Sequence, residues 1–236
     1  MDFAVYLPMA NARDEFEALI FARLITDFCS DPKRQMEAAS FQRNSLNLSD
    51  YDAFQFMRAW RSGMLQHQGR GIYQFCENGS REQLFWSGSS TINPRPFTLW
   101  IEPVIAVGAM ARLHFDFGWP HNRIGTQSED WAFDIVAFQA QSDCEWIAGE
   151  VKKTQLEINQ LLELMRGFGC DPSSEEPRSG KPRNAYKKVA ALRRRQPPLF
   201  WAIGPNGFSR VFRVQYLANA HLILTEADER ELRFVR

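Results

Sequence analysis

Two apolar segments in the second half of the chain each carry an acidic residue. Asp134 lies in the first segment, and sixteen positions later Glu150-Val151-Lys152 ends the second. If residues 141–143 form a hairpin loop, the two segments pair as antiparallel strands, with Asp134 opposite Glu150, Val136 opposite Ala148 and Phe138 opposite Trp146. Because side chains alternate between the faces of a strand, Lys152 shares the face of Glu150. The sequence therefore predicts two carboxylates and an ammonium group side by side.

This combination predicts metal-assisted hydrolysis of a phosphate. Two opposed carboxylates repel each other, and a divalent cation resolves the conflict. Mg²⁺ or Mn²⁺ takes hard oxygen ligands and keeps some of its waters, and a bound metal lowers the pKa of a water ligand. We therefore expect Asp134 and Glu150 to hold the metal, and Lys152 to orient the attacking water or stabilise the charge that develops on the phosphate.

Asp134 followed by Glu150-Val151-Lys152 resembles the signature of the PD-(D/E)XK nuclease superfamily, over roughly Trp100 to Ile203. The arrangement is similar to archaeal Holliday-junction resolvases and Mrr-like restriction nucleases, in which a glutamate on the first helix joins the site. Glu102 matches that glutamate. The resemblance implies that Asp134 and Glu150 are metal ligands, that Lys152 is the catalytic lysine and that Glu102 is a third carboxylate. It also implies a core ordered helix, three strands, helix, strand.

The chain departs from the superfamily pattern at two points. Phe133 stands where many members have proline before the aspartate, and Gln155 is followed four positions later by Asn159 rather than tyrosine, so the RecB-like branch is not indicated. Glu102 also has a structural interpretation, because an acidic residue at the start of a helix interacts favourably with the helix dipole.

Other candidate ligands flank this segment. Glu129 and Asp130 would serve either as extra metal ligands or as solvated loop residues. His114, Asp116 and His121 form an H-x-D-x4-H pattern that suggests zinc or iron, although no fourth ligand is evident and a histidine at a strand end commonly pairs with a carboxylate.

The charge of the chain is balanced but unevenly distributed. Its 236 residues contain 28 basic and 28 acidic side chains, which argues against a protein that coats nucleic acid by bulk electrostatics. Residues 178–195 nevertheless hold eight basic side chains and no acid. We expect this segment to contact a DNA backbone, with RNA not excluded, through Lys181, Arg183, Lys187, Lys188, Arg193, Arg194 and Arg195. The alternative is a solvated charged face.

Composition excludes several classes of protein. An aromatic content of 13% argues against disorder, and the four scattered cysteines form no C-x-x-C pair of the kind found in thiolate zinc sites. No apolar stretch is long enough to span a bilayer, and the N-terminus lacks the pattern of a secretory signal. We therefore expect a cytoplasmic protein that does not associate with a membrane.

Apolar periodicity and turn residues predict the elements that position these residues. Expected helices cover 14–28, the segment after Ser49, 103–110, the segment from Thr154 (capping box with Glu157) and 184–195, with a loop at 171–183. Their expected buried stripes are Phe16, Ile20, Leu24 and Phe28 on the first helix, Phe54, Met57, Trp60 and Met64 on the second, and Ile158, Leu161, Leu162, Met165 and Phe168 on the helix from Thr154. Gly167 and Gly169 are expected to end that last helix. Expected strands are 71–76, 83–86, 112–117, 132–138, 145–152, 199–203 and 210–216. The predicted fold is α/β, a restriction-endonuclease-like core at 96–236 with a mixed sheet flanked by helices, preceded by an accessory α+β region at 1–95.

The expected activity is that of a Mg²⁺- or Mn²⁺-dependent nuclease that hydrolyses DNA phosphodiester bonds, with endo rather than exo action. The resemblance implies a role in restriction, phage defence or DNA repair, and homodimerisation. Two alternatives stay open: a catalytically idle nuclease-fold protein that binds nucleic acid or recruits a partner subunit, and a transition-metal enzyme centred on His114, Asp116 and His121.

Overall fold

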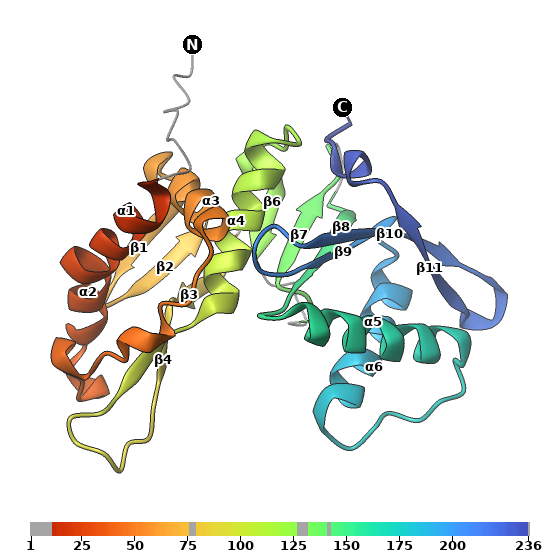
Figure 1. The fold of residues 1–236 in the computed structure, drawn as a ribbon. Coiled ribbons are helices and arrows are strands. Elements are labelled where there is room, and N and C mark those ends of the chain that lie inside the picture. Colours follow the sequence, from red (N-terminus) through yellow and green to blue (C-terminus); the bar gives the residue numbers. More distant parts are fainter. Residues whose placement is uncertain (1–10, 76–78, 127–131, 141–142, 236) are drawn as a thin grey trace. The chain divides into compact units, whose positions relative to one another are not determined.

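The computed structural model describes residues 11–75, 79–126, 132–140 and 143–235 (Figure 1). The chain forms two compact units, one of Met1–Cys76 and Arg81–Ala111, the other of Glu77–Ser80 and Arg112–Arg236. The division therefore falls inside helix α4 (Ile101–Phe115), whereas the sequence placed it near residue 95.

The first unit combines helices with short antiparallel strands. Its helices are α1 (Ala12–Leu19), which continues through a π-helical turn (Ile20–Leu24) into α2 (Ile25–Cys29), α3 (Asp50–Arg61) and the first part of α4, with 3₁₀ turns at Pro32–Arg34, Ala38–Ser40 and Arg43–Ser45. Strands β1 (Leu65–Gly69), β2 (Ile72–Phe75) and β3 (Arg81–Gln83) form one sheet, and β4 (Phe85–Ser87) pairs with β5 (Phe97–Leu99). The predicted strand at 83–86 is thus divided between β3 and β4.

The predicted helices of this unit are present, with one change of face. The stripe expected on the first helix is buried, at Phe16, Ile20, Leu24 and Phe28. The Ser49 side chain caps α3 by accepting a hydrogen bond from the Asp52 N–H at 3.1 Å. On α3, however, the predicted Phe54 and Trp60 are only half-buried, while Phe56 is fully buried with its ring 5.1 Å from that of Phe16. The contact with α1 therefore decides which side of α3 faces inward.

The second unit is a six-stranded mixed sheet with two helices on one face (Figure 1). Its elements are β6 (Ile124–Thr126), β7 (Ile135–Phe138), β8 (Glu145–Val151), α5 (Gln155–Cys170), α6 (Gly180–Arg195), β9 (Leu199–Ile203), β10 (Ser209–Tyr216) and β11 (Leu222–Ala227), with 3₁₀ turns at His121–Arg123, Ala218–Ala220 and Glu229–Leu232. The strand order is β11-β10-β9-β8-β7-β6, and only the β8–β9 pair is parallel. The prediction of an α/β fold with a mixed sheet is confirmed.

One predicted strand of this unit is wrong, and two observed strands were not predicted. Residues 112–117 were expected as a strand but form the end of α4 and the turn after it, where the Asp116 N–H donates to the Arg112 carbonyl at 2.8 Å. The segment from Val104 to Leu113 is almost wholly buried, so its apolar run shows no alternation that would separate helix from strand. Strands β6 and β11 were not predicted, although the buried Leu222 and Leu224 of β11 alternate with exposed residues. No helix in the described ranges has the length and apolar character needed to cross a membrane.

Helix α5 begins and packs as its sequence predicts. The Thr154 hydroxyl oxygen accepts a hydrogen bond from the Glu157 N–H at 3.2 Å, which confirms the capping interaction. The expected stripe of Ile158, Leu161, Leu162 and Met165 is buried under the sheet and α6. Gly167 and Gly169 were expected to end the helix, yet α5 continues to Cys170. Gly169 instead allows the helix to lie close to the backbone of β11.

We predict that Gly169→Ala destabilises the second unit and that Gly167→Ala does not. A Cβ atom at residue 169 would lie 2.5 Å from the Leu222 carbonyl oxygen, a backbone atom that cannot move aside alone, so a loss of about 1–3 kcal/mol is expected. A Cβ atom at residue 167 would meet nothing within 4 Å, and alanine there should raise the free energy of unfolding by about 0.5–1 kcal/mol. Urea unfolding of both variants measures this, and equal midpoints would contradict the close packing of α5 on β11.

Candidate functional site

The predicted pairing of β7 with β8 is largely confirmed. Ile135 pairs with Gly149, Val136 with Ala148 and Ala137 with Ile147, as expected. A β-bulge then shifts the register, so that Phe138 pairs with Glu145 rather than with Trp146. The bulge lies at the hairpin end of the strands, away from the acidic residues, and at the other end the ladder stops at Ile135 and Gly149, one residue short of the predicted Asp134–Glu150 pair.

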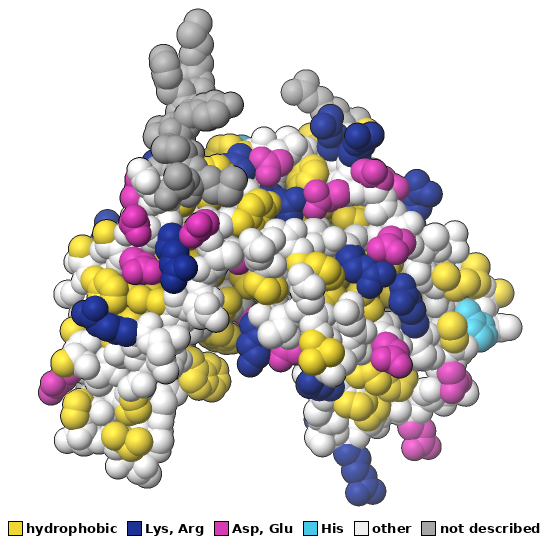
Figure 2. All heavy atoms as spheres, in the orientation of Figure 1, with side chains coloured by type: hydrophobic (Ala, Val, Ile, Leu, Met, Phe, Trp, Pro, Cys, Tyr) yellow, Lys and Arg dark blue, Asp and Glu magenta, His cyan; other side chains and the backbone are white. Residues whose placement is uncertain are grey.

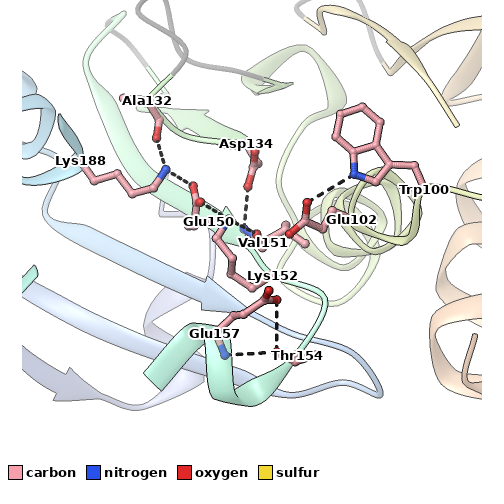
Figure 3. Close-up of polar contacts among 10 residues, drawn as sticks. All are labelled: Trp100, Glu102, Ala132, Asp134, Glu150, Val151, Lys152, Thr154, Glu157 and Lys188. Carbon is pink, nitrogen blue, oxygen red and sulfur yellow. Dashed lines mark hydrogen bonds and ion pairs between the residues drawn. The ribbon is translucent and has the colours of Figure 1, made fainter. Parts of the chain in front are cut away.

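Asp134 lies one residue before β7 and is held by a side-chain contact. Its Oδ2 accepts a hydrogen bond from the backbone N–H of Val151 at 2.8 Å (Figure 3). The bond joins the residue that leads into β7 to the last residue of β8. The structure thus brings Asp134 beside the Glu150-Val151-Lys152 segment.

Glu150 is the centre of a buried ionic cluster. Only 2% of this residue is exposed. Its Oε1 lies 2.5 Å from the Nζ of Lys152, and its Oε2 lies 2.6 Å from the Nζ of Lys188 (Figure 3). We call Asp134, Glu150, Lys152 and Lys188 the carboxylate–lysine cluster. It contains two carboxyl groups and two ammonium groups, so its charges balance when both carboxyl groups are ionised.

The position of Glu150 on its strand explains how Lys188 reaches it. Glu150 pairs with Ala202 of β9, and it shares a face of β8 with Ala148, since the two are separated by one residue. Both alanines belong to the core that α5 and α6 cover. Glu150 therefore points toward the helices, and the small alanine side chains leave room for a lysine of α6 beside it.

Lys188 was predicted to contact DNA, but the structure places it inside the unit. The residue is 9% exposed, and its ammonium group donates to the carbonyl oxygen of Ala132 at 2.7 Å as well as to Glu150. It also lies 5.6 Å from the centre of the Phe133 ring. Its role was missed, although the spacing of Ala185, Lys188, Val189 and Leu192 along one helix face could have indicated burial.

Burial controls the ionisation of Asp134. Loss of solvent raises the pKa of its carboxyl group to about 7, and the neighbouring Glu150 carboxylate acts in the same direction. The ammonium groups of Lys152 and Lys188 and the Val151 N–H oppose this rise in the pKa of Asp134. A further cation beside this carboxyl group would lower its pKa, because positive charge favours the ionised form.

Glu102 is not placed in the cluster by the structure. It lies in the first turn of α4, where the Trp100 indole N–H donates to its Oε2 at 3.4 Å. Both residues belong to the first unit, whereas the carboxylate–lysine cluster belongs to the second. The role of Glu102 as a third carboxylate of the site stays a prediction. Glu129 and Asp130 lie outside the described residues.

The histidine pattern does not form a metal site in the part of the chain that the structure describes. His114 lies on α4 rather than on a strand, and its Nδ1 is 2.7 Å from the Trp119 carbonyl oxygen. The rings of His114 and His121 are 6.3 Å apart, and the Asp116 carboxylate lies 3.8 Å from the Arg112 side chain. Among the described residues, no three His, Cys, Asp or Glu side chains group as metal ligands. The zinc or iron alternative has no support in these ranges.

The other six basic residues predicted to contact DNA fall into two groups. The first group is exposed and consists of Lys181, Arg183, Lys187 and Arg194. The second group is anchored within the unit: Arg193 donates to the carbonyl oxygens of Ala220 and Phe168, both at 2.7 Å, and Arg195 pairs with Glu145. On the face drawn in Figure 2, basic and acidic side chains are interspersed. The basic segment is therefore partly a structural element.

We predict that Asp134→Asn changes the pH dependence of stability. The pKa of Asp134 lies near 7 in the folded chain, above its ordinary value of 3.8, so the neutral form stabilises the fold. That contribution is complete below pH 4 and is lost as the pH rises through 7. Between pH 4 and pH 8, the free energy of unfolding of Asp134→Asn should therefore rise relative to that of the wild type by up to about 4 kcal/mol, at about 1.4 kcal/mol for each unit of pKa.

Urea unfolding in EDTA at a series of pH values measures this difference. Asn still accepts the hydrogen bond from Val151, so the comparison isolates the proton. Asp143→Asn, at an exposed position of the same unit, controls for the loss of one surface carboxylate. A stability difference between Asp134→Asn and wild type that stays constant with pH would show that Asp134 is not perturbed by burial.

Comparison with known proteins adds no relative from which roles could be carried over to these residues. No family model, no curated protein and no solved structure matches the chain. The chemistry of the site therefore has to be argued from the contacts of the carboxylate–lysine cluster themselves.

Proposed function

We propose that the protein is a metal-dependent nuclease that hydrolyses DNA phosphodiester bonds. The observation that carries the proposal is the meeting of Asp134, Glu150 and Lys152 at the carboxyl end of β8, each held by a defined contact. The order α4, β6, β7, β8, α5, α6, β9 supports the proposal, because it differs from the helix, three strands, helix, strand order implied by the resemblance to PD-(D/E)XK nucleases only in the additional helix α6 before β9. Endonuclease action in restriction, phage defence or DNA repair, and homodimerisation, follow from the same resemblance.

The donor set fits Mg²⁺ or Mn²⁺ better than zinc. Two carboxyl groups, Asp134 and Glu150, are hard oxygen ligands, and a cation that keeps several waters needs few protein ligands. A zinc site would need three or four ligands, which the described residues do not group together. A divalent cation held by Asp134 and Glu150 would supply Lewis-acid charge toward a phosphate and lower the pKa of a bound water.

Lys152 is suited to contact the substrate. Its side chain is 27% exposed, whereas that of Glu150 is 3% exposed, so the ammonium group lies between the buried carboxylate and solvent. It donates to Glu150 and to the Val151 carbonyl oxygen at 2.8 Å. From this position the ammonium can turn a hydrogen toward a phosphate oxygen, where it would stabilise the charge that develops during attack by water.

The exposed cations near the start of α6 are suited to hold the DNA backbone. Lys181, Arg183 and Lys187 are exposed on the helix that also sends Lys188 into the cluster. Contacts of this kind position a duplex without reading its sequence. Because the chain as a whole has no net charge, we expect modest affinity that falls steeply with salt.

One observation favours a second function, that of a catalytically idle nucleic-acid-binding subunit or scaffold. Both oxygens of Glu150 have an ammonium partner, Lys152 on one and Lys188 on the other, so this carboxylate is fully compensated by side chains of the chain itself. Such a protein would bind nucleic acid, or recruit a partner subunit, without cleaving. Cleavage assays separate the two functions.

We predict that cleavage requires each of the three residues. Asp134→Asn, Glu150→Gln and Lys152→Met should each lower the rate by at least about 100-fold, because each removes a metal ligand or the charge that stabilises the phosphate. The assay follows supercoiled plasmid, linear duplex, single-stranded DNA and RNA in Mg²⁺ or Mn²⁺. Appearance of nicked or linear plasmid identifies endonuclease action.

Glu163→Gln, at an exposed position of α5, is the matched control and should keep wild-type activity. Full activity in Asp134→Asn and Lys152→Met would remove the site assignment. A wild type that binds DNA but leaves every substrate intact would favour the idle subunit.

We predict that the exposed cations, and not the anchored ones, set the salt dependence of DNA binding. A triple variant with Gln at Lys181, Arg183 and Lys187 should weaken binding and reduce the slope of log affinity against log salt by about 2–3, since each backbone contact contributes about 0.9. Fluorescence anisotropy in EDTA measures binding without cleavage. Arg230→Gln, at an exposed position outside this segment, is the control; an unchanged slope in the triple variant would make α6 a solvated face.

A further inference from the structure

Lys188 is a buried lysine whose ammonium group contacts strand β8 and the segment that leads into β7. It donates to Glu150 Oε2 in β8 at 2.6 Å and to the Ala132 carbonyl oxygen, two residues before Asp134, at 2.7 Å. The side chain is 11% exposed. A buried charge is retained only where it is paired and hydrogen-bonded, and both conditions are met here. The contacts join α6 to both segments that carry the candidate metal ligands.

The two lysines contact different oxygens of Glu150 and differ in exposure. Lys188 reaches Oε2 from the helix-covered interior, while the more exposed Lys152 reaches Oε1. With Lys152 alone, any movement of its ammonium group toward a phosphate would leave the buried Glu150 carboxylate uncompensated, which is strongly unfavourable. With Lys188 in place, Glu150 keeps one ion pair when Lys152 moves.

We propose that Lys188 is a positioning residue, the permanent counter-ion of Glu150, which keeps the site folded without a metal and leaves Lys152 and Glu150 Oε1 available to substrate and cation. This inference rests on the proposed function for the roles of Lys152 and the metal. Its core, the electrostatic dependence of Glu150 on Lys188, is testable without any cleavage.

The stability of single variants tests the division of roles between the lysines. Lys188→Met keeps the length of the apolar stem but removes the charge, and in EDTA it should lower the melting temperature by roughly 10 °C, as expected for a buried ion pair that loses one partner. Lys152→Met should lower it by clearly less, because its ammonium group is more exposed. Lys187→Met, the neighbouring exposed lysine, should shift it by no more than about 2 °C.

Two rescue experiments separate a counter-ion from a side chain that only packs. Glu150→Gln combined with Lys188→Met removes both charges and should recover at least half of the melting temperature that Lys188→Met loses. If the lysine only packs, the double variant should melt no higher than Lys188→Met. Addition of Mg²⁺ or Mn²⁺ should raise the melting temperature of Lys188→Met more than that of the wild type, since a cation then replaces the missing charge.

The outcomes are distinguishable from failure of the proposed function. Equal losses in Lys188→Met and Lys152→Met, or no recovery in the double variant, would overturn the counter-ion role. A larger Mg²⁺ or Mn²⁺ effect on Lys188→Met than on the wild type supports it, and equal effects contradict the link to a cation. A wild type that cleaves no substrate but shows recovery in the double variant would contradict the nuclease activity and support the counter-ion role.

Discussion

The buried carboxylate of Glu150 is the constraint on which the rest of the site depends. It lies on β8, inside the sheet, where an uncompensated charge would be strongly destabilising. Two ammonium groups compensate it, one from the same strand and one from α6. The second lies far along the chain and is brought back by the crossover from β8 through α5 and α6 to β9. A parallel pair of strands needs such a crossover, so one connection serves both the sheet and the ion pair.

The surroundings of Glu150 are consistent with this requirement. Ala148 and Ala202 beside it are small, which leaves space for the lysine stem under the helices. Asp134 lies at the margin of the same cluster, held by the Val151 N–H, and burial together with the charge of Glu150 raises its pKa. The charge of Glu150 is thus compensated within the chain, whereas Asp134 has a pKa near 7. The proposed roles of a cation that keeps waters and of a lysine that contacts a phosphate rest on this asymmetry.

The basic segment before β9 has a structural role beside the one proposed for it in DNA binding. Part of it holds the fold together, since Lys188 pairs with Glu150, Arg193 binds backbone carbonyls and Arg195 pairs with Glu145. The exposed part, including Lys181 and Lys187, is what remains for an anionic partner. A segment with eight basic residues therefore presents a smaller positive surface than its composition indicates, and the DNA contact that we propose for it is correspondingly local.

The sequence by itself determined what depends on short-range pattern. The hairpin loop expected at residues 141–143 predicted the pairing of Val136 with Ala148, and the capping residue Thr154 predicted the start of α5. Both follow from interactions between residues close in the chain. Tertiary structure decided the rest. The apolar run through residue 113 continued as a helix, and Lys188 turned inward because a buried carboxylate on a distant strand required its charge.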